Sequence, residues 1–345
     1  MGKYKNMGTF DGGMVTMPSS GSVTAQKFRT MDEAAIASGG AFLQSELEKR
    51  DQVIRQPLTS FTYGRDIPIR VGGGWAEYVS AMSVGYGVTG GSEEGPVHAG
   101  GANGIPLVQA DFDKELFKTH IFSVGMRIMF VDMQRGNMTG RSYESILRDG
   151  IRMTYDKHMD ANAYVGIKKY GSTGLVNNPN VKITNAATVG SSTKFKDKTA
   201  DEILSDINNA ILAVWEQAEY DRDAIPNHIL MPYEQFNYLA TTKVSDLAEK
   251  TILTFLLENN VARNNGADLY IGAVSWCKEA GLGGTDRMVV YINKEKYLAM
   301  DELVPLSRAM TQANATNVCY DTAYLANLSE LQLFYENIML YVDGI

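Results

Sequence analysis

Histidine and cysteine are the side chains most often used as nucleophiles and metal ligands, and this chain has few of either. The four histidines lie far apart in the sequence and lack the spacing with which one helix presents two zinc ligands. They are His98, His120, His158 and His228. Cys277 and Cys319 are too few for a disulfide framework, which fits a reducing cytosol. No histidine lies near Cys319 in the sequence, so we interpret it as a buried structural cysteine.

One glycine motif has the spacing of a dinucleotide-binding loop. The segment Gly85-Tyr-Gly-Val-Thr-Gly90 matches G-x-G-x-x-G, but such a site needs a helix that begins at the loop, because the helix N-terminus binds the pyrophosphate. The residues that follow, from Gly91 to Pro96, forbid a helix there. We therefore interpret these glycines as part of the tip of a β-hairpin. The sequence also lacks the G-x-S-x-G, H-E-x-x-H and P-loop motifs.

Two aspartates are the remaining candidates for chemistry. Asp221 and Asp223 could bind a metal ion, and together with His228 they would suit a hydrolase. A solvated turn before Pro226 explains the two carboxylates more simply, and His158 is interpreted as a polar residue on the flank of a helix. Because no set of acids, bases and metal ligands converges, we expect no catalytic, cofactor-binding or metal-binding residue and no enzyme activity.

The composition is that of an ordinary globular protein of about two domains. Of 345 residues, 44% are hydrophobic and 21% are charged, which excludes wholesale disorder, collagen and long coiled coils. No run of ~18 apolar residues occurs, and the polar N-terminus lacks the apolar core of a signal peptide, so neither a membrane segment nor a secretory signal is expected. The net charge of −8 is unevenly spread. Residues 123–195 hold ten basic and five acidic groups, a net +5, and residues 196–345 hold eleven basic and twenty-two acidic groups, a net −11.

An alternating pattern predicts a long β-hairpin. Even-numbered positions from Tyr78 to Val88 are mostly bulky and apolar, whereas odd-numbered positions are small or polar. The alternation returns at Val108 and continues to Phe130. The intervening residues 87–104 include seven glycines in eighteen positions. An isolated two-stranded ribbon is marginally stable in water, so we expect something outside the domain to hold this hairpin.

Helical periodicity is strongest over residues 142–167, where apolar side chains recur on one stripe. At ~1.5 Å per residue this helix would be about 40 Å long. Its predicted stripe consists of Tyr143, Ile146, Leu147, Ile151, Tyr155, Met159, Ala163 and Ile167. Two shorter helices are predicted over residues 31–37 and 41–54, and Pro57 ends the second.

A small α/β region is predicted from Thr199 onward. Thr199-x-x-Glu202 is a capping-box pattern that begins a helix, and Pro232 suits the start of another. A further helix is predicted over residues 251–258, and strands over 228–231, 269–274 and 288–292. Strands are also predicted over 303–310, 318–326 and 331–342.

Several short segments are similar to those of a known family. They are Ile67-Pro-Ile leading to Trp75-Ala-Glu-Tyr, Gly104-Ile-Pro-Leu-Val, Gly171-Ser-Thr-Gly-Leu-Val-Asn-Asn-Pro179, His228-Ile-Leu-Met-Pro-Tyr-Glu-Gln-Phe, Thr251-Ile-Leu-Thr-Phe-Leu-Leu-Glu-Asn-Asn260 and the C-terminal Gly344-Ile345. In this order, over residues ~40–345, they resemble the major capsid proteins of tailed bacteriophages, whose Hong Kong 97-type fold is shared with encapsulin shell proteins. Agreement of element order with these segments is what makes the resemblance specific.

The resemblance implies an α+β fold of five parts. They are an N-terminal arm with short helices (1–65), an extended β-hairpin loop (66–122), a peripheral domain with a long spine helix (123–196), an α/β axial domain (197–302) and return strands of the peripheral domain (303–345). In this family the extended loop lies over a neighbouring subunit and the arm reaches another. Some members weld subunits through a loop lysine, but here the stretch from Gly72 to Asp113 contains no lysine.

The function implied by the resemblance is that of a structural protein. Copies would assemble as hexamers and pentamers into an icosahedral shell around double-stranded DNA, which coat proteins contact through the phosphate backbone. Expected partners are the chain itself, scaffold, portal or decoration proteins and the packaged DNA, with no membrane. The expected location is the virion, after assembly in the host cytoplasm. The alternative is an encapsulin-type nanocompartment that encloses a protein cargo.

Overall fold

The computed structural model describes residues 57, 59–89, 107–139, 142–190, 192–245 and 249–345, together with the strands β1 (Val15–Thr16) and β2 (Lys27–Phe28). The chain divides into two units, Met1–Thr59 and Ser60–Ile345. In the first unit β1 and β2 pair in antiparallel fashion. The helices predicted over 31–37 and 41–54 lie outside the described residues.

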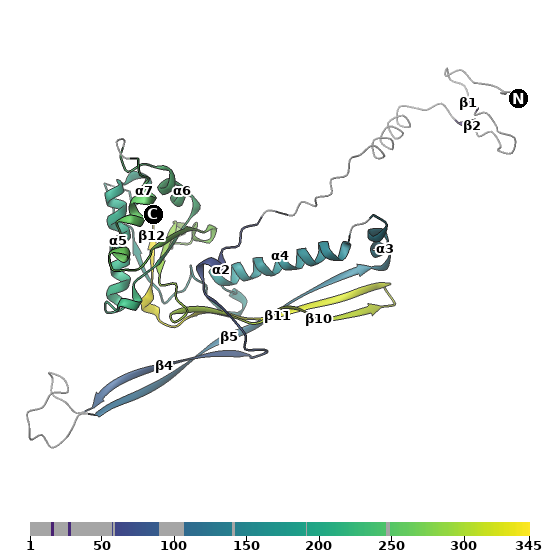
Figure 1. Cartoon of the computed structure of the whole chain (residues 1–345), viewed down its shortest axis with the longest axis horizontal. Coiled ribbons are helices and arrows are strands. Elements are labelled where there is room, and N and C mark those ends of the chain that lie inside the picture. Colours follow the sequence, from purple (N-terminus) through teal and green to yellow (C-terminus); the bar gives the residue numbers. More distant parts are fainter. Residues whose placement is uncertain are drawn as a thin grey trace, which may run out of the picture. The chain divides into compact units, whose positions relative to one another are not determined.

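A five-stranded sheet with the order β3-β10-β11-β5-β4 carries the predicted hairpin. Its strands are β3 (Ile69–Val71), β4 (Tyr78–Thr89), β5 (Leu107–Met129), β10 (Leu298–Asn314) and β11 (Cys319–Leu333). Neighbouring strands are antiparallel except β3 and β10. Strand β5 pairs with β4 over residues 107–118 and with β11 over residues 119–129, so that one strand belongs first to the hairpin and then to the sheet (Figure 1).

The predicted long helix is confirmed as α4 (Tyr143–Tyr164), which lies along β5 and β11 (Figure 1). The hydroxyl of Ser142 caps its N-terminus by accepting the backbone N–H of Ser145 at 3.3 Å. Four members of the predicted stripe are buried; they are Ile151, Tyr155, Met159 and Ala163. Tyr143 and Ile146 are exposed, so the first turn of α4 is not covered by the described residues of this chain.

Two helices flank α4 that the sequence pattern did not predict. Strand β5 ends at Met129, one residue before the predicted end of the alternation at Phe130, and α3 (Phe130–Thr139) begins at once. The short helix α2 (Tyr63–Asp66) precedes β3 and contacts α4. Short 3₁₀ helices complete the connections; they are η1 (Lys168–Tyr170), η2 (Phe195–Asp197), η3 (Arg222–Ala224), η4 (Ser275–Cys277), η5 (Leu282–Gly284) and η6 (Glu336–Ile338).

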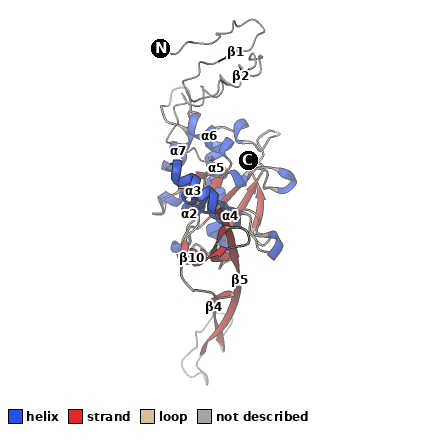
Figure 2. Cartoon of the chain, turned by 90° about the vertical axis from the view of Figure 1, so that its right-hand side faces the viewer, coloured by secondary structure: helices blue, strands red, loops and turns tan. Residues whose placement is uncertain are grey.

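A second five-stranded sheet has the order β6-β12-β9-β7-β8 and carries the other helices. Its strands are β6 (Lys182–Asn185), β7 (His228–Met231), β8 (Tyr270–Ala273), β9 (Arg287–Tyr291) and β12 (Met339–Asp343), and its helices are α5 (Ala200–Gln217), α6 (Tyr233–Thr241), α7 (Ile252–Glu258) and α8 (Val261–Asn264). Figure 2 shows these helices gathered away from the long strands β4 and β5. The capping box predicted at Thr199 and Glu202 is present, and Pro232 is the N-cap of α6. Strands β6 and β12 come from outside residues 197–302, so this sheet takes strands from both sides of the predicted axial segment.

The predicted division of the last strands is wrong. Strand β11 runs unbroken from Cys319 to Leu333, and η6 separates it from β12, whereas the sequence pattern predicts strands over 318–326 and 331–342. Buried polar side chains interrupt the apolar alternation inside β11. Asn327 donates to the carbonyls of Gly74 and Ala76 at 3.0 and 3.1 Å, and these long-range contacts have no local sequence signature.

Candidate assembly surface

The β4–β5 hairpin has two chemically different faces. Paired residues of an antiparallel ribbon lie on the same side, and the register pairs Met82 with Lys114, Val84 with Phe112 and Val88 with Val108. All even-numbered residues therefore share one face, which we call the apolar hairpin face. Its described side chains are Tyr78, Ser80, Met82, Val84, Tyr86, Val88, Val108, Ala110, Phe112, Lys114, Leu116 and Lys118.

The large side chains of the apolar hairpin face are not covered by the described part of the chain. Tyr86 is 78% exposed, Met82 71% and Phe112 65%. Exposed apolar side chains gathered on one surface are typical of interaction sites. The predicted alternation of this segment is therefore confirmed, and the face that it defines lacks an intramolecular partner among the described residues.

The opposite face of the hairpin is acidic. Asp111, Asp113 and Glu115 alternate with the apolar set and lie on the odd-numbered side. Burial and the neighbouring carboxylates of Glu336, Asp113 and Glu330 raise the pKa of Glu115. Over residues 78–89 and 107–118, the ribbon thus presents three carboxylates on one side and only cationic and uncharged residues on the other.

The apolar hairpin face continues into the interior of the sheet. Pairing along β5 is uninterrupted, so its even-numbered residues keep to one side of the strand. In the sheet these are Val124, Met126 and Ile128, which pack in a cluster with Ile151 of α4. The same face of one strand is therefore covered by α4 at one end and uncovered at the other.

A cavity of about 390 Å³ lies at the base of the hairpin. Its lining includes Trp75, Tyr78 and Tyr170, together with His120 at the start of the β5–β11 pairing. The Nε2 atoms of His120 and His158 are 3.3 Å apart, and the ring of His120 stacks on Tyr170. Burial, and secondarily the neighbouring His158, lower the pKa of His120 to about 4. Burial also lowers the pKa of His158.

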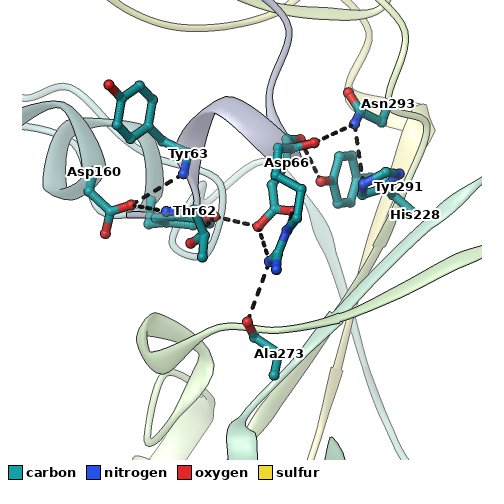
Figure 3. A network of polar contacts seen from close by, with 10 residues as sticks. Thr62, Tyr63, Asp66, Asp160, His228, Ala273, Tyr291 and Asn293 are labelled. Carbon is teal, nitrogen blue, oxygen red and sulfur yellow. Dashed lines mark hydrogen bonds and ion pairs between the residues drawn. The ribbon is translucent and has the colours of Figure 1, made fainter. Parts of the chain in front are cut away.

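A polar network centred on Asp66 fixes α2 to the rest of the fold (Figure 3). The Asp66 carboxylate is fully buried and forms an ion pair with Arg65, whose Nε and Nη2 donate at 2.6 and 2.8 Å. The hydroxyl of Tyr164 at the end of α4 also donates to this carboxylate. The hydroxyl of Tyr291 in β9 donates to the backbone carbonyl of Asp66 at 2.6 Å.

Asp160 of α4 forms the second part of this network. Its Oδ1 accepts the backbone N–H groups of Thr62 and Tyr63 at 3.0 and 3.2 Å, as Figure 3 shows. Its Oδ2 accepts the indole N–H of Trp276 at 2.6 Å. Burial, followed by the nearby Asp156 carboxylate, raises the pKa of Tyr63 to about 12. The two aspartates together connect α2, α4 and the second sheet at the point from which the chain enters β3 and the hairpin.

The residues considered for hydrolysis occupy structural positions. Asp221 caps η3 by accepting the backbone N–H of Asp223 at 3.1 Å. His228 lies in β7 between the rings of Tyr270 and Tyr291, and its Nε2 is 3.3 Å from Nδ2 of Asn293. Burial is the main cause that lowers the pKa of His228 to about 4.

The other candidates from the sequence are also placed. Cys277 and Cys319 are both buried and unbridged, as interpreted for Cys319. Gly85 and Gly87 lie inside β4, opposite Asp111 and Gln109, so the interpretation of these two as tip residues is wrong; the ribbon extends beyond them. His98 lies outside the described residues. Within the described ranges, no group of three or more His, Cys, Asp or Glu residues is placed to hold a metal ion.

Sequence reasoning missed the His120–His158 pair and the network around Asp66. The two histidines are separated by 38 positions, and Asp66 and Tyr164 by 98. Two local patterns hinted at the histidine pair. The alternation of β5 places His120 on the side of the strand that faces α4, and His158 lies beside the apolar stripe of α4. Among the described residues, no helix is long and apolar enough to cross a membrane.

Comparison of the structure with solved structures identifies the class of fold. A capsid chain of Myoviridae phage XM1 superimposes with a TM-score of 0.71 at 14% identity, covering 87% of this chain and 98% of that chain. The capsid of a native GTA particle gives 0.60 at 11% identity, covering 91% and 99%. A chain of Microbacterium phage Oxtober96 gives 0.57 at 12% identity, covering 87% and 97%. The chain therefore has the mixed α/β fold of phage capsid proteins.

Sequence comparison then identifies the family. The model of the major capsid protein family matches residues 96–345, and the chain belongs to that family. A search of curated proteins found no match. The chain is thus a structural capsid protein of a bacteriophage-type particle and not an enzyme. The match to capsid proteins does not favour the encapsulin alternative.

Proposed function

We propose that this capsid protein assembles as hexamers and pentamers into a closed icosahedral shell in which the β4–β5 hairpin of each copy overlies a neighbouring copy. The observation that carries this proposal is the apolar hairpin face, whose large side chains have no partner in the described part of their own chain. Burial of apolar surface is the main driving force of association, so such a face favours contact with another subunit.

The parts of the chain would then serve different positions in the shell. Residues 66–122 form the extended loop, α4 is the spine helix of a peripheral domain over residues 123–196 and 303–345, and residues 197–302 form the axial domain around which capsomers close. Residues 1–65 form the arm. The network of Asp66 and Asp160 supports this layout, because it fixes the segment that leads to the loop against both α4 and the second sheet.

The enclosed cargo in this proposal is double-stranded DNA. The exposed side of α4 carries Arg152 and Lys157 together with Asp149, and Arg148 there pairs with Glu144 at 2.6 Å. The positive charge that favours DNA contact therefore belongs to the segment 123–195 as a whole, whose net charge is +5. Non-specific DNA contact requires cations near the phosphate backbone but no base readout, which suits a coat protein of net charge −8 with one segment of net positive charge. Scaffold, portal or decoration proteins would act as further partners, with assembly in the host cytoplasm before the protein becomes part of the virion.

The test is to express the full chain and examine it by light scattering and electron microscopy, with a scaffold partner supplied in a parallel sample. Closed particles or capsomers are expected. Particles purified from infected cells should protect double-stranded DNA from nuclease. A compact monomer of 37.9 kDa at high concentration in both samples would overturn the proposal.

A further inference from the structure

We propose that His120 of β5 and His158 of α4 together bind a zinc ion at the base of the hairpin. Both residues belong to one copy of the chain, so this inference is independent of the proposed assembly. The sequence alone predicts no such site, because the two histidines are separated by 38 positions.

The two imidazoles converge through nitrogen atoms that can bind a metal. Their Nε2 atoms are 3.3 Å apart, whereas their ring centroids are 5.5 Å apart, so the rings approach each other by their Nε2 edges. Two imidazoles on a tetrahedral zinc ion, with Zn–N bonds of about 2.0–2.1 Å, have their nitrogens about 3.3–3.4 Å apart. The separation in this chain therefore matches that of two zinc ligands.

The two rings can release the space between them without losing a proton from the pair. In the absence of metal, one Nε2–H donates to the other Nε2, whereas zinc requires both Nε2 atoms to be unprotonated. The donating ring then carries its proton on Nδ1 instead, as a neutral imidazole can. Burial, which lowers the pKa of both histidines, favours this neutral form.

Aromatic neighbours hold both rings in this orientation. The ring of Tyr170 stacks on His120 with an interplanar angle of 23°, and the ring of Phe122 lies 5.0 Å from that of His158, centroid to centroid. The backbone of His120 is fixed as well, because it pairs with Leu328 in β11. Ligands that are already positioned lose little conformational freedom when the metal binds.

The cavity of about 390 Å³ at the base of the hairpin would complete the site. His120 is part of its lining, so the cavity offers room for the water molecules that fill the remaining coordination positions. The charged residues in the lining are Glu77, Glu330 and Lys118. Two carboxylates against one ammonium group favour a cation in this space.

The ligand type selects the class of metal. Imidazole nitrogen suits zinc and its neighbours in the transition series, whereas magnesium and calcium prefer oxygen ligands. Two protein ligands bind zinc less tightly than the four of a structural site, so we expect zinc to exchange with the solution. When bound, it would tie α4 to β5 at the point where β5 passes from pairing with β11 to pairing with β4.

Zinc titration of the full chain, freed of metal and in competition with a chromogenic chelator at neutral pH, tests the site. We expect one zinc ion per chain, and a loss of affinity of at least ~10-fold in His120→Gln and in His158→Gln. The matched control is His228→Gln, which should bind zinc like the unmodified chain. His228 also lies between aromatic rings, but its Nε2 faces Asn293 rather than a histidine.

X-ray absorption by the zinc-loaded, unmodified chain keeps the test decisive if a variant fails to fold. We expect two imidazole nitrogens at about 2.0–2.1 Å from the zinc, with oxygen ligands completing its coordination. A chain that binds no zinc, folded His120 and His158 variants that keep the full affinity, or a spectrum with fewer than two imidazoles overturns the inference. The pair is then a hydrogen bond only, and any zinc is adventitious. None of these results bears on the proposed function, because the zinc site lies within a single copy.

Discussion

Asp66 is the residue on which the connection between hairpin and body depends most directly. It is fully buried, and its carboxylate accepts hydrogen bonds from Arg65 and Tyr164. We expect Asp66→Asn to lower the free energy of unfolding by about 2–3 kcal/mol, below the range for a fully buried pair because the Arg65 side chain is 38% exposed. Urea unfolding measures this loss. The exposed Asp113→Asn should change stability by less than ~0.5 kcal/mol. Equal stability of the two variants would contradict the structural role of Asp66.

Acid should destabilise the fold through its buried histidines. The pKa of His120 is about 4 in the folded chain and about 6.5 when unfolded, so between these values the unfolded chain binds more protons. Stability is therefore fully present above pH ~6.5 and falls as the pH drops toward 4. The contact with His158 acts in the same direction. Two neutral imidazoles can share one N–H between their Nε2 atoms, whereas two protonated rings would place like charges 3.3 Å apart.

The variant His120→Gln isolates this contribution. Its urea midpoint should depend less steeply on pH between 7 and 5 than that of the unmodified chain. Some slope will remain, because the pKa of His228 is also lowered to about 4. If the urea midpoint of the variant depends on pH as steeply as that of the unmodified chain, His120 has the same pKa in the folded and the unfolded chain.

At the scale of elements, the apolar stripe of α4 packs against the sheet at β5 and β11. Ile151 is 6% exposed and packs with Met126, Ile128 and Tyr324. Ile151→Asp buries an unpaired carboxylate at a cost of several kcal/mol, so the variant should be insoluble or unable to assemble. Thr154→Asp, at an exposed position of the same helix, is the control and should remain soluble. A soluble, assembly-competent Ile151→Asp would contradict the packing.

The hairpin should be dispensable for folding but not for assembly. Phe112 contributes to the apolar hairpin face and is 65% exposed in the single chain. We expect Phe112→Asp to unfold at a urea concentration close to that of the unmodified chain and to form few or no particles in electron microscopy. Asp113→Asn, on the acidic face, should assemble. Normal particles from Phe112→Asp would show that the apolar hairpin face does not contribute to assembly.

Elements whose apolar residues recur at the spacing of a helix or a strand could be predicted from the sequence, and elements that depend on distant partners could not. The hairpin, α4 and the Thr199 capping box follow from local spacing and were found where predicted. The sequence pattern divides strand β11 in two because Asn327 and Ser329 are polar. The partners of Asn327 lie some 250 positions away, in the segment before β4. The Asp66 network was missed for the same reason, since its groups come from α2, α4 and β9.

At the scale of the whole molecule, we expect a shell without covalent links between subunits. The stretch from Gly72 to Asp113 contains no lysine, and Lys114 and Lys118 lie on the inner part of the hairpin, opposite Met82 and Tyr78. Boiled particles on a denaturing gel should therefore run as one band near 37.9 kDa. A ladder of covalent pentamers and hexamers would contradict this expectation and would assign a welding amine to Lys114, Lys118 or another lysine.

The length of β5 has a mechanical consequence. This strand has 23 residues, about 75 Å at ~3.3 Å per residue, and joins the hairpin to the sheet without a bend-forming loop. A pull on the hairpin along its axis therefore loads the hydrogen bonds between β5 and β11 in shear, so that they share the force instead of opening one after another. In the proposed shell, a pull that one copy exerts on the hairpin of another would therefore pass into the body of that chain along this strand.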